Sequence, residues 1–233
     1  MTQEYSIGDQ QKLVFYHFDI FNYKEAWDFQ EHLYEQVLEN SSNNTMPLSH
    51  HLIFCQHNHV YTLGQNGSEN NLLINQIQLK AKNAEFYKIN RGGDITYHGP
   101  GQLVGYPILN LSILRIGVKQ YIYLLEQVII DTLFQYEIKA GRKAGATGVW
   151  IDVDKAGLER KICAIGVRCS HWITMHGFAL NINTDLSYFN YINPCGFVDK
   201  AVTSIEKELG QKICFEDVEK IVLRNFLKTF FNK

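Results

Sequence analysis

The chain has 233 residues, of which 45% are hydrophobic and 20% are charged, and its formal net charge is -2. This length and apolar content predict one domain, spanning residues 1–233, with a substantial core. The near-neutral charge excludes a protein that binds nucleic acid through overall positive charge. The sequence shows neither a basic, apolar leader nor a run of about eighteen apolar residues, so we expect a soluble, cytoplasmic protein with no membrane partner.

The first half of the chain predicts short strands and one long helix. Residues 13–18 have the pattern of a strand, and residues 22–39 carry apolar side chains at helical spacing. Residues 40–49, NSSNNTMPLS, are polar, and we expect a flexible loop there. Further strands are predicted at 51–55, 60–63, 86–90 and 102–111.

The second half predicts helices at both ends of a group of strands. Residues 119–136 have an almost continuous apolar helical face, and residues 215–231 have the spacing of a closing helix. Between them, strands are predicted at 148–153, 161–169 and 175–183, with DKAGLE as the turn that joins the first two. Runs of antiparallel strands together with long helices indicate an α+β domain.

A glycine-rich stretch, RGGDITYHGPGQ, fills residues 91–102. It is not a P-loop, because no GK[ST] follows, and it is not a dinucleotide fingerprint, because no helix opens after the glycines. Such a stretch often does no more than connect two strands. Alternatively, Gly92 and Gly93 leave backbone N–H groups uncovered beside Arg91, Thr96 and His98, and the loop can then wrap a polar head or an extended chain.

Five cysteines form neither a dense disulfide scaffold nor a CxxC zinc motif. A cysteine is most often a small buried hydrophobe, and the strand pattern around Cys163 fits that role. Cys195 differs, because Pro194 and Gly196 flank it in NPCGF, a turn that can present a thiol at a cleft. The HxH spacing of His57 and His59 has no evident third ligand, so we expect no metal site.

A nucleophilic thiol needs activation, because the thiolate is the attacking species and an ordinary thiol is mostly protonated at neutral pH. A nearby ammonium group favours the thiolate, and a desolvated lysine can itself accept a proton. Lys161 opens the strand KICAIG, in line with Cys163 and Ile165. A solvent-exposed strand end is the alternative for this lysine, and sequence distance does not decide whether it meets Cys195.

Five segments, taken in order, resemble the signature segments of bacterial lipoyl(octanoyl) transferases, and the likeness covers nearly the whole chain. They are RGGDITYHGPGQLVGYPI, GVWI, RKICAIGVR, HGFALN and INPCG. One departure is the run from His57 to His59, which reads His-Asn-His where the family commonly reads His-Pro-Pro. The resemblance implies the fold of lipoate- and biotin-protein ligase catalytic domains, a mixed, largely antiparallel β-sheet flanked by helices.

The resemblance also implies site residues. Cys195 matches the nucleophile that forms an acyl thioester, and Lys161 matches the lysine that activates it and handles protons. The implied substrate-binding residues are Arg91, Gly92, Gly93, Asp94, Ile95, Thr96, Tyr97, His98, Ala164, Ile165, Gly166, Gly177, Phe178 and Ala179.

The implied reaction moves an octanoyl or lipoyl group from acyl carrier protein to a lysine of lipoyl domains, without ATP or another cofactor. The implied acceptors are the lipoyl domains of 2-oxoacid dehydrogenase complexes and the glycine cleavage H protein, and the pathway is lipoate biosynthesis. Such partners are typically acidic, and Lys139, Arg142 and Lys143 are either a docking patch for them or a solvated loop. Two rival functions remain: an ATP-dependent lipoate-protein ligase, and a non-catalytic module that binds acyl groups or carrier proteins.

Overall fold

A large mixed sheet is the centre of the fold. The computed structural model describes residues 1–8, 10–43, 48–193 and 201–232. Within them the strand order is β1 (Thr2–Gly8), β2 (Gln11–Ile20), β3 (Leu48–Gln56), β7 (Gln102–Ile108), β11 (Ile173–Asn181), β10 (Arg160–Ser170), β9 (Ala146–Ile151) and β8 (Ala140–Lys143). The short β12 (Ala201–Val202) pairs with β10. Only the β2–β3 and β10–β12 pairs of this described sheet are parallel, so the expected α+β class with a largely antiparallel sheet is confirmed.

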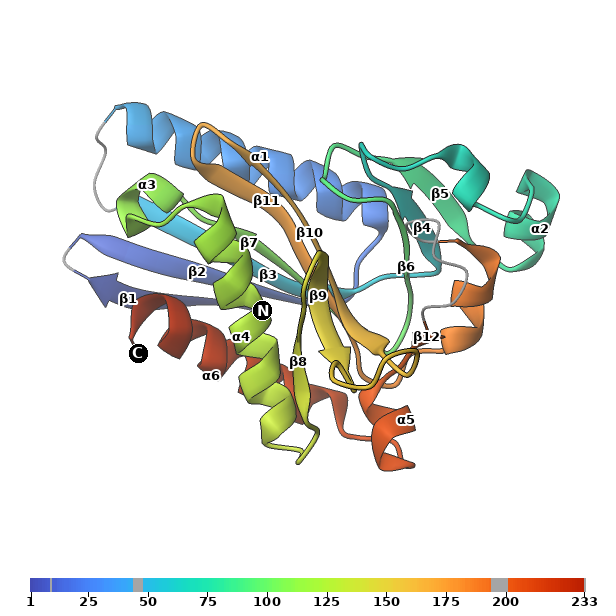
Figure 1. Ribbon diagram of the computed structural model, residues 1–233. Helices are drawn as coiled ribbons and strands as arrows, with labels where there is room; N and C mark the ends of the chain where they lie inside the picture. Colours follow the sequence, from blue (N-terminus) through green and yellow to red (C-terminus); the bar gives the residue numbers. More distant parts are fainter. Residues whose placement is uncertain (9, 44–47, 194–200, 233) are drawn as a thin grey trace.

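Helices cover both faces of this sheet (Figure 1). On one face α1 (Tyr23–Ser42) packs its Leu33 and Val37 with Ile53 and Val104. On the other face α4 (Val118–Phe134) and α6 (Phe215–Phe231) pack against the neighbouring positions of the same strands, such as Leu103. This alternation follows from the period of two in a strand, and each fully buried aliphatic side chain contributes roughly 1.5–3 kcal/mol.

A second, three-stranded sheet lies beside the large one. Its central β4 (Val60–Leu63) pairs in parallel with β5 (Glu85–Lys88) and antiparallel with β6 (Ile95–His98). The short elements η1 (Glu69–Asn71), α2 (Gln76–Ala81) and η2 (Leu186–Tyr191) complete this part of the fold. Tyr61 and Tyr97 are fully buried, and Tyr97 stacks on Tyr188 of η2. Aromatic packing therefore attaches η2 to the small sheet.

The long predicted helices are confirmed as α1, α4 and α6, but the predicted loop at 40–49 is wrong at both of its ends. The helix α1 continues to Ser42, and β3 already begins at Leu48, while residues 44–47 lie outside the described residues. Tertiary contacts explain the longer helix, because the Ser41 hydroxyl donates to Val37 O and accepts from the Asn110 side chain. The polar composition of residues 40–49 by itself does not indicate such tertiary contacts.

Several short elements have no counterpart among the predicted ones. The strand β6 occupies the second part of the glycine-rich stretch, which was expected to be a loop. The other missed elements are β1, β8, β12, α2, α3 (Leu111–Leu114) and α5 (Ile205–Leu209). These elements are short or lie at sheet edges, where pairing with neighbours decides the structure. No helix among the described residues combines the length and apolar character that a membrane span requires.

Candidate active site

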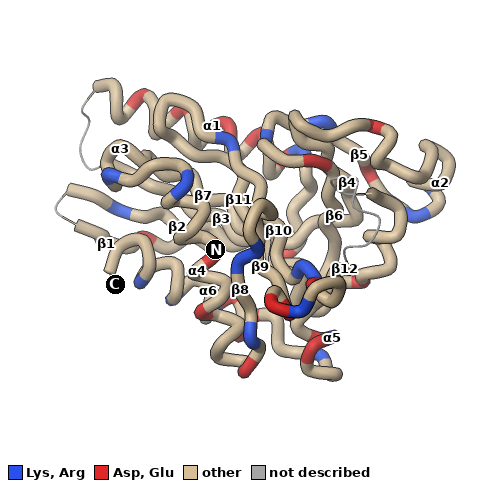
Figure 2. Tube along the Cα trace, viewed as in Figure 1, with Lys and Arg blue, Asp and Glu red and all other residues tan. Residues whose placement is uncertain are grey.

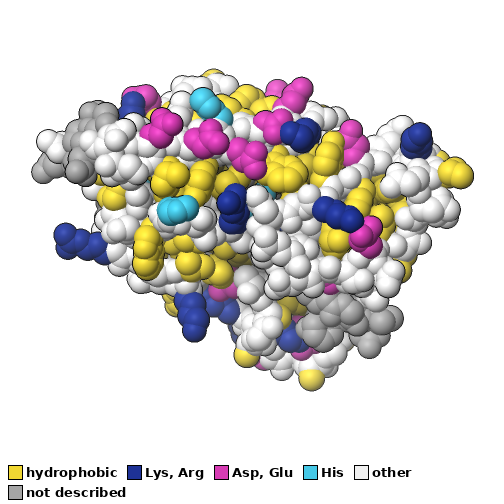
Figure 3. Space-filling model, turned by 90° about the horizontal axis from the view of Figure 1, so that it is seen from above, with side chains coloured by type: hydrophobic (Ala, Val, Ile, Leu, Met, Phe, Trp, Pro, Cys, Tyr) yellow, Lys and Arg dark blue, Asp and Glu magenta, His cyan; other side chains and the backbone are white. Residues whose placement is uncertain are grey.

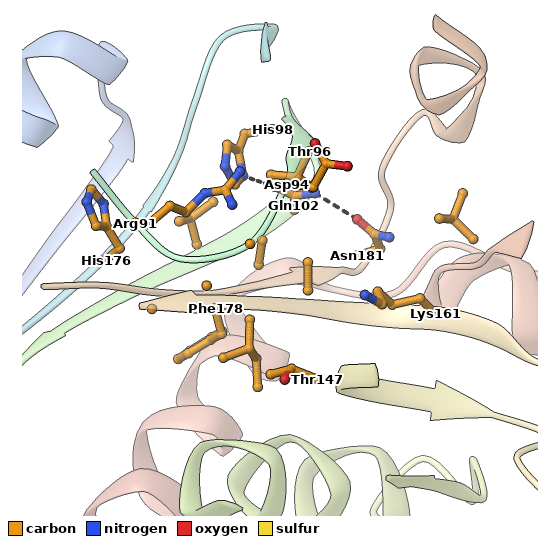
Figure 4. A pocket seen from close by; sticks show the side chains of 18 of the residues that line it. Arg91, Asp94, Thr96, His98, Gln102, Thr147, Lys161, His176, Phe178 and Asn181 are labelled. Carbon is orange, nitrogen blue, oxygen red and sulfur yellow. Dashed lines mark hydrogen bonds between the residues drawn. The ribbon is translucent and has the colours of Figure 1, made fainter. Parts of the chain in front are cut away.

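A cavity of about 320 Å³ lies where the small sheet meets β7, β10 and β11 of the large sheet. Its floor contains Ala164 and Gly166 from β10 and Gly177 and Ala179 from β11, and its far wall is the segment from Arg91 to His98. In Figure 4, Arg91 and His176 lie at one end and Lys161 lies at the other. The volume is at the lower end of the range for small-molecule sites.

All the residues expected to bind substrate line this cavity except Gly92 and Tyr97. Tyr97 packs instead with Tyr61 and Tyr188 in the core of the small sheet, because side chains on β6 alternate. Gly92 donates its backbone N–H to Val167 O at 2.9 Å, so this N–H is not available to a ligand, contrary to the expectation. The structure thus brings the three predicted segments together around one space.

Much of the glycine content serves close packing of the protein's own chain. A Cβ atom on Gly64 would lie 2.4 Å from Gly93 O, and one on Gly166 would lie 3.1 Å from Gly92 O. Gly93 has a φ of +86°, a conformation that glycine adopts without strain. The backbone of residues 91–93 therefore packs between β4 and β10, so what approaches this stretch most closely is the protein itself.

Arg91 anchors the loop with a buried guanidinium group. Its Nη2 atom donates to Thr62 O at 2.7 Å and to Thr62 Oγ1 at 3.0 Å, and its Nη1 donates to Gly92 O at 3.0 Å. The side chain is only 7% exposed, so a positive charge is held inside the site. These contacts fix the loop to β4.

A chain of side-chain hydrogen bonds crosses the site (Figure 4). His98 Nδ1 pairs with Gln102 Oε1 at 2.8 Å, and Gln102 Nε2 donates to Asn181 Oδ1 at 2.8 Å. Asn181 Nδ2 then donates to Thr203 O at 3.0 Å, and the Thr203 N–H donates to Lys161 O at 2.9 Å. Gln102 and Asn181 were not among the predicted site residues, although both belong to the signature segments RGGDITYHGPGQLVGYPI and HGFALN.

The histidines at the site are neutral in the folded protein. Burial, followed by the effect of nearby His57, lowers the pKa of His98 to about 3. Burial, followed by the charge of Arg91, lowers the pKa of His176 to about 3. His176 Nε2 contacts Asn90 Oδ1 at 2.8 Å, while its Nδ1 is buried without a partner, as suits an unprotonated nitrogen. Both rings thus supply hydrogen-bonding groups without positive charge.

We predict that the protein loses stability between pH 7 and pH 5.5. His50, His51 and His57 also have pKa values lowered by burial, to about 4, so these rings and the two at the site stay neutral when folded. The unfolded chain takes up these protons near pH 6.5, so the free energy of unfolding falls as the pH falls, by roughly 1 kcal/mol for each fully buried histidine. Urea unfolding at several pH values measures the change.

The control for this prediction is the exposed His32. A His32→Gln variant should retain the full slope of stability against pH. Equal unfolding free energies of the unsubstituted protein at pH 7 and pH 5.5 would contradict neutral burial of the five rings.

Lys161 reaches the cavity because the register between β9 and β10 shifts there. Lys161 pairs with Trp150 and Cys163 pairs with Val149, so Ile162 and Cys163 both enter the core. The strict alternation expected for this strand is therefore wrong at its start, because a bulge adds one residue. The Lys161 ammonium lies 4.7 Å from the centroid of the Trp150 ring.

Cys163 is a packing residue, as its strand pattern predicted. The thiol is fully buried, and burial raises its pKa well above the ordinary value. Burial likewise raises the pKa of the fully buried Cys55. Neither thiol has the exposure and thiolate character that a nucleophile requires.

Cys195 lies outside the described residues, which continue on either side of its segment. At one end, the Asn193 N–H donates to Asn71 O at 2.8 Å. At the other, Ala201 and Val202 pair in parallel with Arg160 and Lys161, and both line the cavity. Described residues on both sides of the Cys195 segment line the cavity, Phe189 before it and Ala201 and Val202 after it.

The expected docking patch is largely neutralised by ion pairs. Arg142 Nε lies 3.0 Å from Glu126 Oε2, and Lys143 pairs with Glu159. Lys139 is exposed and lies 3.9 Å from Asp154. Figure 2 shows basic and acidic positions together around β8, β9 and β10. The alternative of a solvated surface segment fits this geometry better than a positive patch does.

His57 and His59 of the His-Asn-His run form hydrogen bonds that stabilise the fold. His57 Nδ1 donates to Phe21 O at 2.6 Å, and its Nε2 accepts from the Tyr106 hydroxyl at 2.7 Å. His59 contacts the Tyr97 hydroxyl at 2.7 Å and stacks on Tyr188 with 4.1 Å between ring centroids. The two rings thus engage different hydroxyl groups, and His59 helps to hold η2, the element that precedes the Cys195 segment.

Residues 22–227 match the model of the lipoyl protein ligase A/B catalytic domain. The chain belongs to this family. Within it, the chain is 52% identical to an octanoyltransferase of Christiangramia forsetii, over 90% of this chain and 92% of that protein. It is 50% identical to an octanoyltransferase of Bacteroides fragilis, over 92% of this chain and 96% of that protein. The chain is an acyltransferase.

Solved structures support the fold of this family member. The structure of lipoate-protein ligase A bound with ATP aligns with a TM-score of 0.66 and 14% identity, covering 92% of this chain and 84% of that one. At that identity the likeness concerns the fold alone. It agrees with the described arrangement of one mixed sheet flanked by helices.

Proposed function

We propose that this enzyme transfers octanoyl groups in lipoate biosynthesis, from acyl carrier protein to a lysine of a lipoyl domain, through a thioester on Cys195. The observation that supports the proposal is that Lys161 lines one cavity together with Phe189, which precedes the Cys195 segment, and Ala201 and Val202, which follow it. The octanoyltransferases that are about 50% identical over nearly the whole chain support the same acyl group.

The cavity suits a medium-length acyl chain. Val104, Ile165, Phe178 and Ala179 provide apolar surface, and Gly166 and Gly177 also line the cavity. Burying a methylene group contributes about 0.8 kcal/mol, so an octanoyl chain gains on the order of 5 kcal/mol. This is enough to hold the chain, whereas one methylene more or less shifts specificity by only about 1–3 kcal/mol.

In the first half-reaction, Cys195 attacks the thioester carbonyl of the octanoyl carrier protein. Transfer of the thiol proton to Lys161 gives a thiolate beside an ammonium group, which is the reactive form of the pair. The new carbon–sulfur bond forms, the bond to the carrier sulfur breaks, and Lys161 returns its proton to the leaving thiolate. The products are octanoyl-Cys195 and free carrier thiol.

In the second half-reaction, the amine of the target lysine attacks octanoyl-Cys195. An amine must lose a proton to become an amide nitrogen, and neutral Lys161 accepts it. The Cys195 sulfur leaves and regains a proton from Lys161, which restores the resting enzyme. The thioester is already activated, so the cycle consumes no ATP.

The acidic partners of the family suggest where docking does not occur. The face formed by α1 exposes Glu25, Asp28, Glu35 and Glu39. Figure 3 looks onto this side of the molecule and shows the acidic side chains gathered there. Since like charges across an interface oppose association, we propose that acyl carrier protein and the lipoyl domains, including the glycine cleavage H protein, dock away from α1.

One experiment separates the proposal from its two rivals. The protein is incubated with octanoyl carrier protein without ATP, and its intact mass and peptide masses are measured. An added octanoyl group on the Cys195 peptide, discharged by a lipoyl domain, supports the transferase. Uptake that requires ATP and free octanoate indicates a ligase, and no covalent uptake under either condition indicates a binding module.

A further inference from the structure

We infer that Asn181 is a positioning residue whose side-chain amide holds β12 and Thr203 against β10 and so sets the cavity wall at the Lys161 end. The inference rests on the proposed function and adds a residue to it. Both residues of β12 line the cavity, as do Asn181 and Lys161. The Asn181 Nδ2 atom donates to Thr203 O at 3.0 Å, and the Thr203 N–H donates to Lys161 O at 2.9 Å.

The strand β12 forms few ladder contacts of its own. It has two residues, which pair in parallel with Arg160 and Lys161 of β10. The next residue, Thr203, is fully buried, and its hydroxyl donates to Glu208 Oε1. The Asn181 amide binds a different group of the same residue, its backbone carbonyl. A buried carbonyl that loses its donor destabilises the arrangement around it, so this amide supports the short strand.

The hydrogen bonds around Asn181 fix the direction in which its amide points. The Gln102 Nε2 atom donates to Asn181 Oδ1 at 2.8 Å, as shown in Figure 4, and to Tyr97 O at 3.2 Å. Because a backbone carbonyl only accepts, Tyr97 O requires the amide nitrogen of Gln102 on this side. Thr203 O requires the amide nitrogen of Asn181 for the same reason. The Oδ1 atom of Asn181 is then the acceptor for Gln102.

The other end of the chain of hydrogen bonds is fixed from the small sheet. Gln102 Oε1 can only accept, so His98 Nδ1 carries the proton and donates to it at 2.8 Å. His98 Nε2 lies 3.4 Å from Thr62 Oγ1, which itself accepts from Arg91 Nη2 at 3.0 Å. The Thr62 hydroxyl proton is thus directed to His98. Donors and acceptors alternate without conflict as far as Thr203 O, so losing the donor at position 181 cannot be repaired by turning a neighbouring amide.

Charged and titratable groups approach this position from three elements. His98 on β6 is neutral, because burial lowers its pKa to about 3. Lys161 on β10 lines the same cavity, and Glu208 on α5 is paired with Arg160 of β10. Asn181 itself is only 4% exposed. A carboxyl group introduced at position 181 would therefore be buried beside one lysine, one neutral histidine and one ion pair.

An aspartate at position 181 would act as a switch for the hydrogen bond to Thr203. An ionised carboxylate has no donor for Thr203 O, whereas a protonated carboxyl group donates to it as the amide does. A protonated Lys161 favours the ionised form, but burial and the bond to Thr203 O both favour the protonated form. We expect the pKa of this carboxyl group to lie well above that of an exposed aspartate. The donor should therefore return as the pH falls.

The test compares Asn181→Asp with Asn181→Leu in the full-length protein. Calorimetric titration with octanamide, whose carbonyl mimics that of the acyl group and which does not titrate, measures binding at about pH 8 and about pH 6. Leucine resembles asparagine in size and donates at neither pH. Each affinity is divided by that of the unsubstituted protein at the same pH, so effects common to all variants cancel.

We expect Asn181→Asp to bind octanamide about tenfold more weakly than the unsubstituted protein at about pH 8, and within about threefold of it at about pH 6. Asn181→Leu should stay about tenfold weaker at both pH values, since its loss does not titrate. Octanoyl transfer by the two variants should follow the same pH pattern.

Asn183→Asp is the matched control. Asn183 Nδ2 donates to another backbone carbonyl, Ile213 O, at 2.8 Å, and its side chain lies outside the lining of the cavity. This change also sets a carboxylate against a carbonyl, so its thermal unfolding measures the cost to stability alone. Binding of octanamide by this variant should equal that of the unsubstituted protein at both pH values.

Equal affinities of the two Asn181 variants and the unsubstituted protein would overturn the inference. A loss in Asn181→Asp that does not recover at about pH 6 would also overturn it, because such a loss indicates disturbed packing, as would a failure of the unsubstituted protein to bind octanamide. If the binding pattern appears but the unsubstituted protein transfers no octanoyl group, the proposed function falls and the role of Asn181 stands. If transfer occurs and the variants bind and transfer normally, only the role of Asn181 falls.

Discussion

Replacing Cys195 with alanine abolishes octanoyl transfer and leaves binding of octanoyl carrier protein intact. The acyl-enzyme cannot form without the sulfur, so we expect the transfer rate to fall by at least about a thousandfold. Two readouts are needed: octanoyl transfer to a lipoyl domain, followed by mass, and binding of octanoyl carrier protein, followed by titration. A loss of the first with retention of the second assigns the chemistry to the thiol.

Cys214→Ala is the matched control for this substitution. Cys214 is exposed at the start of α6, and its side chain contacts Glu216 outside the cavity. This variant should transfer octanoyl groups at the normal rate. Substantial transfer by Cys195→Ala, or an octanoyl group found on another cysteine, would refute the assignment of the nucleophile.

Replacing Lys161 with methionine slows both half-reactions. Methionine keeps an unbranched side chain of similar length but has no proton to exchange, and positioned proton transfer contributes typically 10²- to 10⁴-fold. We expect losses of about that size in the acylation of Cys195, measured by single-turnover mass addition. The discharge of octanoyl-Cys195 by a lipoyl domain should slow as well.

Lys161→Arg separates charge from proton transfer. A guanidinium group remains positive but does not give up its proton in proteins, so it can favour a thiolate but cannot serve as the base for the target lysine. We expect Cys195 in this variant to react with iodoacetamide while transfer to the lipoyl domain stays slow. Full turnover by Lys161→Arg would remove the base role, and Lys139→Met, whose side chain is 94% exposed, is the control that should retain activity.

The pattern of apolar residues identified the helices α1, α4 and α6 and most long strands, because packing faces repeat with the period of the element. The pattern of apolar residues did not predict β12 or β8. Both strands are short, and β12 is stabilised by pairing with β10 and β8 by pairing with β9. The pattern also mistook the end of α1 for loop, since the contact of Ser41 with Asn110 joins residues 69 positions apart. Long-range contacts of this kind leave no local pattern.

Some features of the candidate site could likewise be predicted from the sequence, and others could not. The resemblance of the sequence motifs to a known family was sufficient to select Lys161 and many of the residues that line the cavity. They also suggested that Gly92 is open to a ligand, but its N–H is bonded to Val167 O on a strand far along the chain. The register shift between Lys161 and Cys163 was equally hidden, since a bulge depends on the partner strand.

Family, reaction class and the candidate pair Cys195 and Lys161 follow from the order of short motifs along the chain, because each motif carries its own local chemistry. The tertiary structure determines which other residues these motifs contact. Only the packed sheets bring Trp150 against Lys161, connect His98 to Thr203 through two side-chain amides, and remove Tyr97 from the cavity. These relations depend on strand register and on close packing between distant segments, and neither is encoded at any single position.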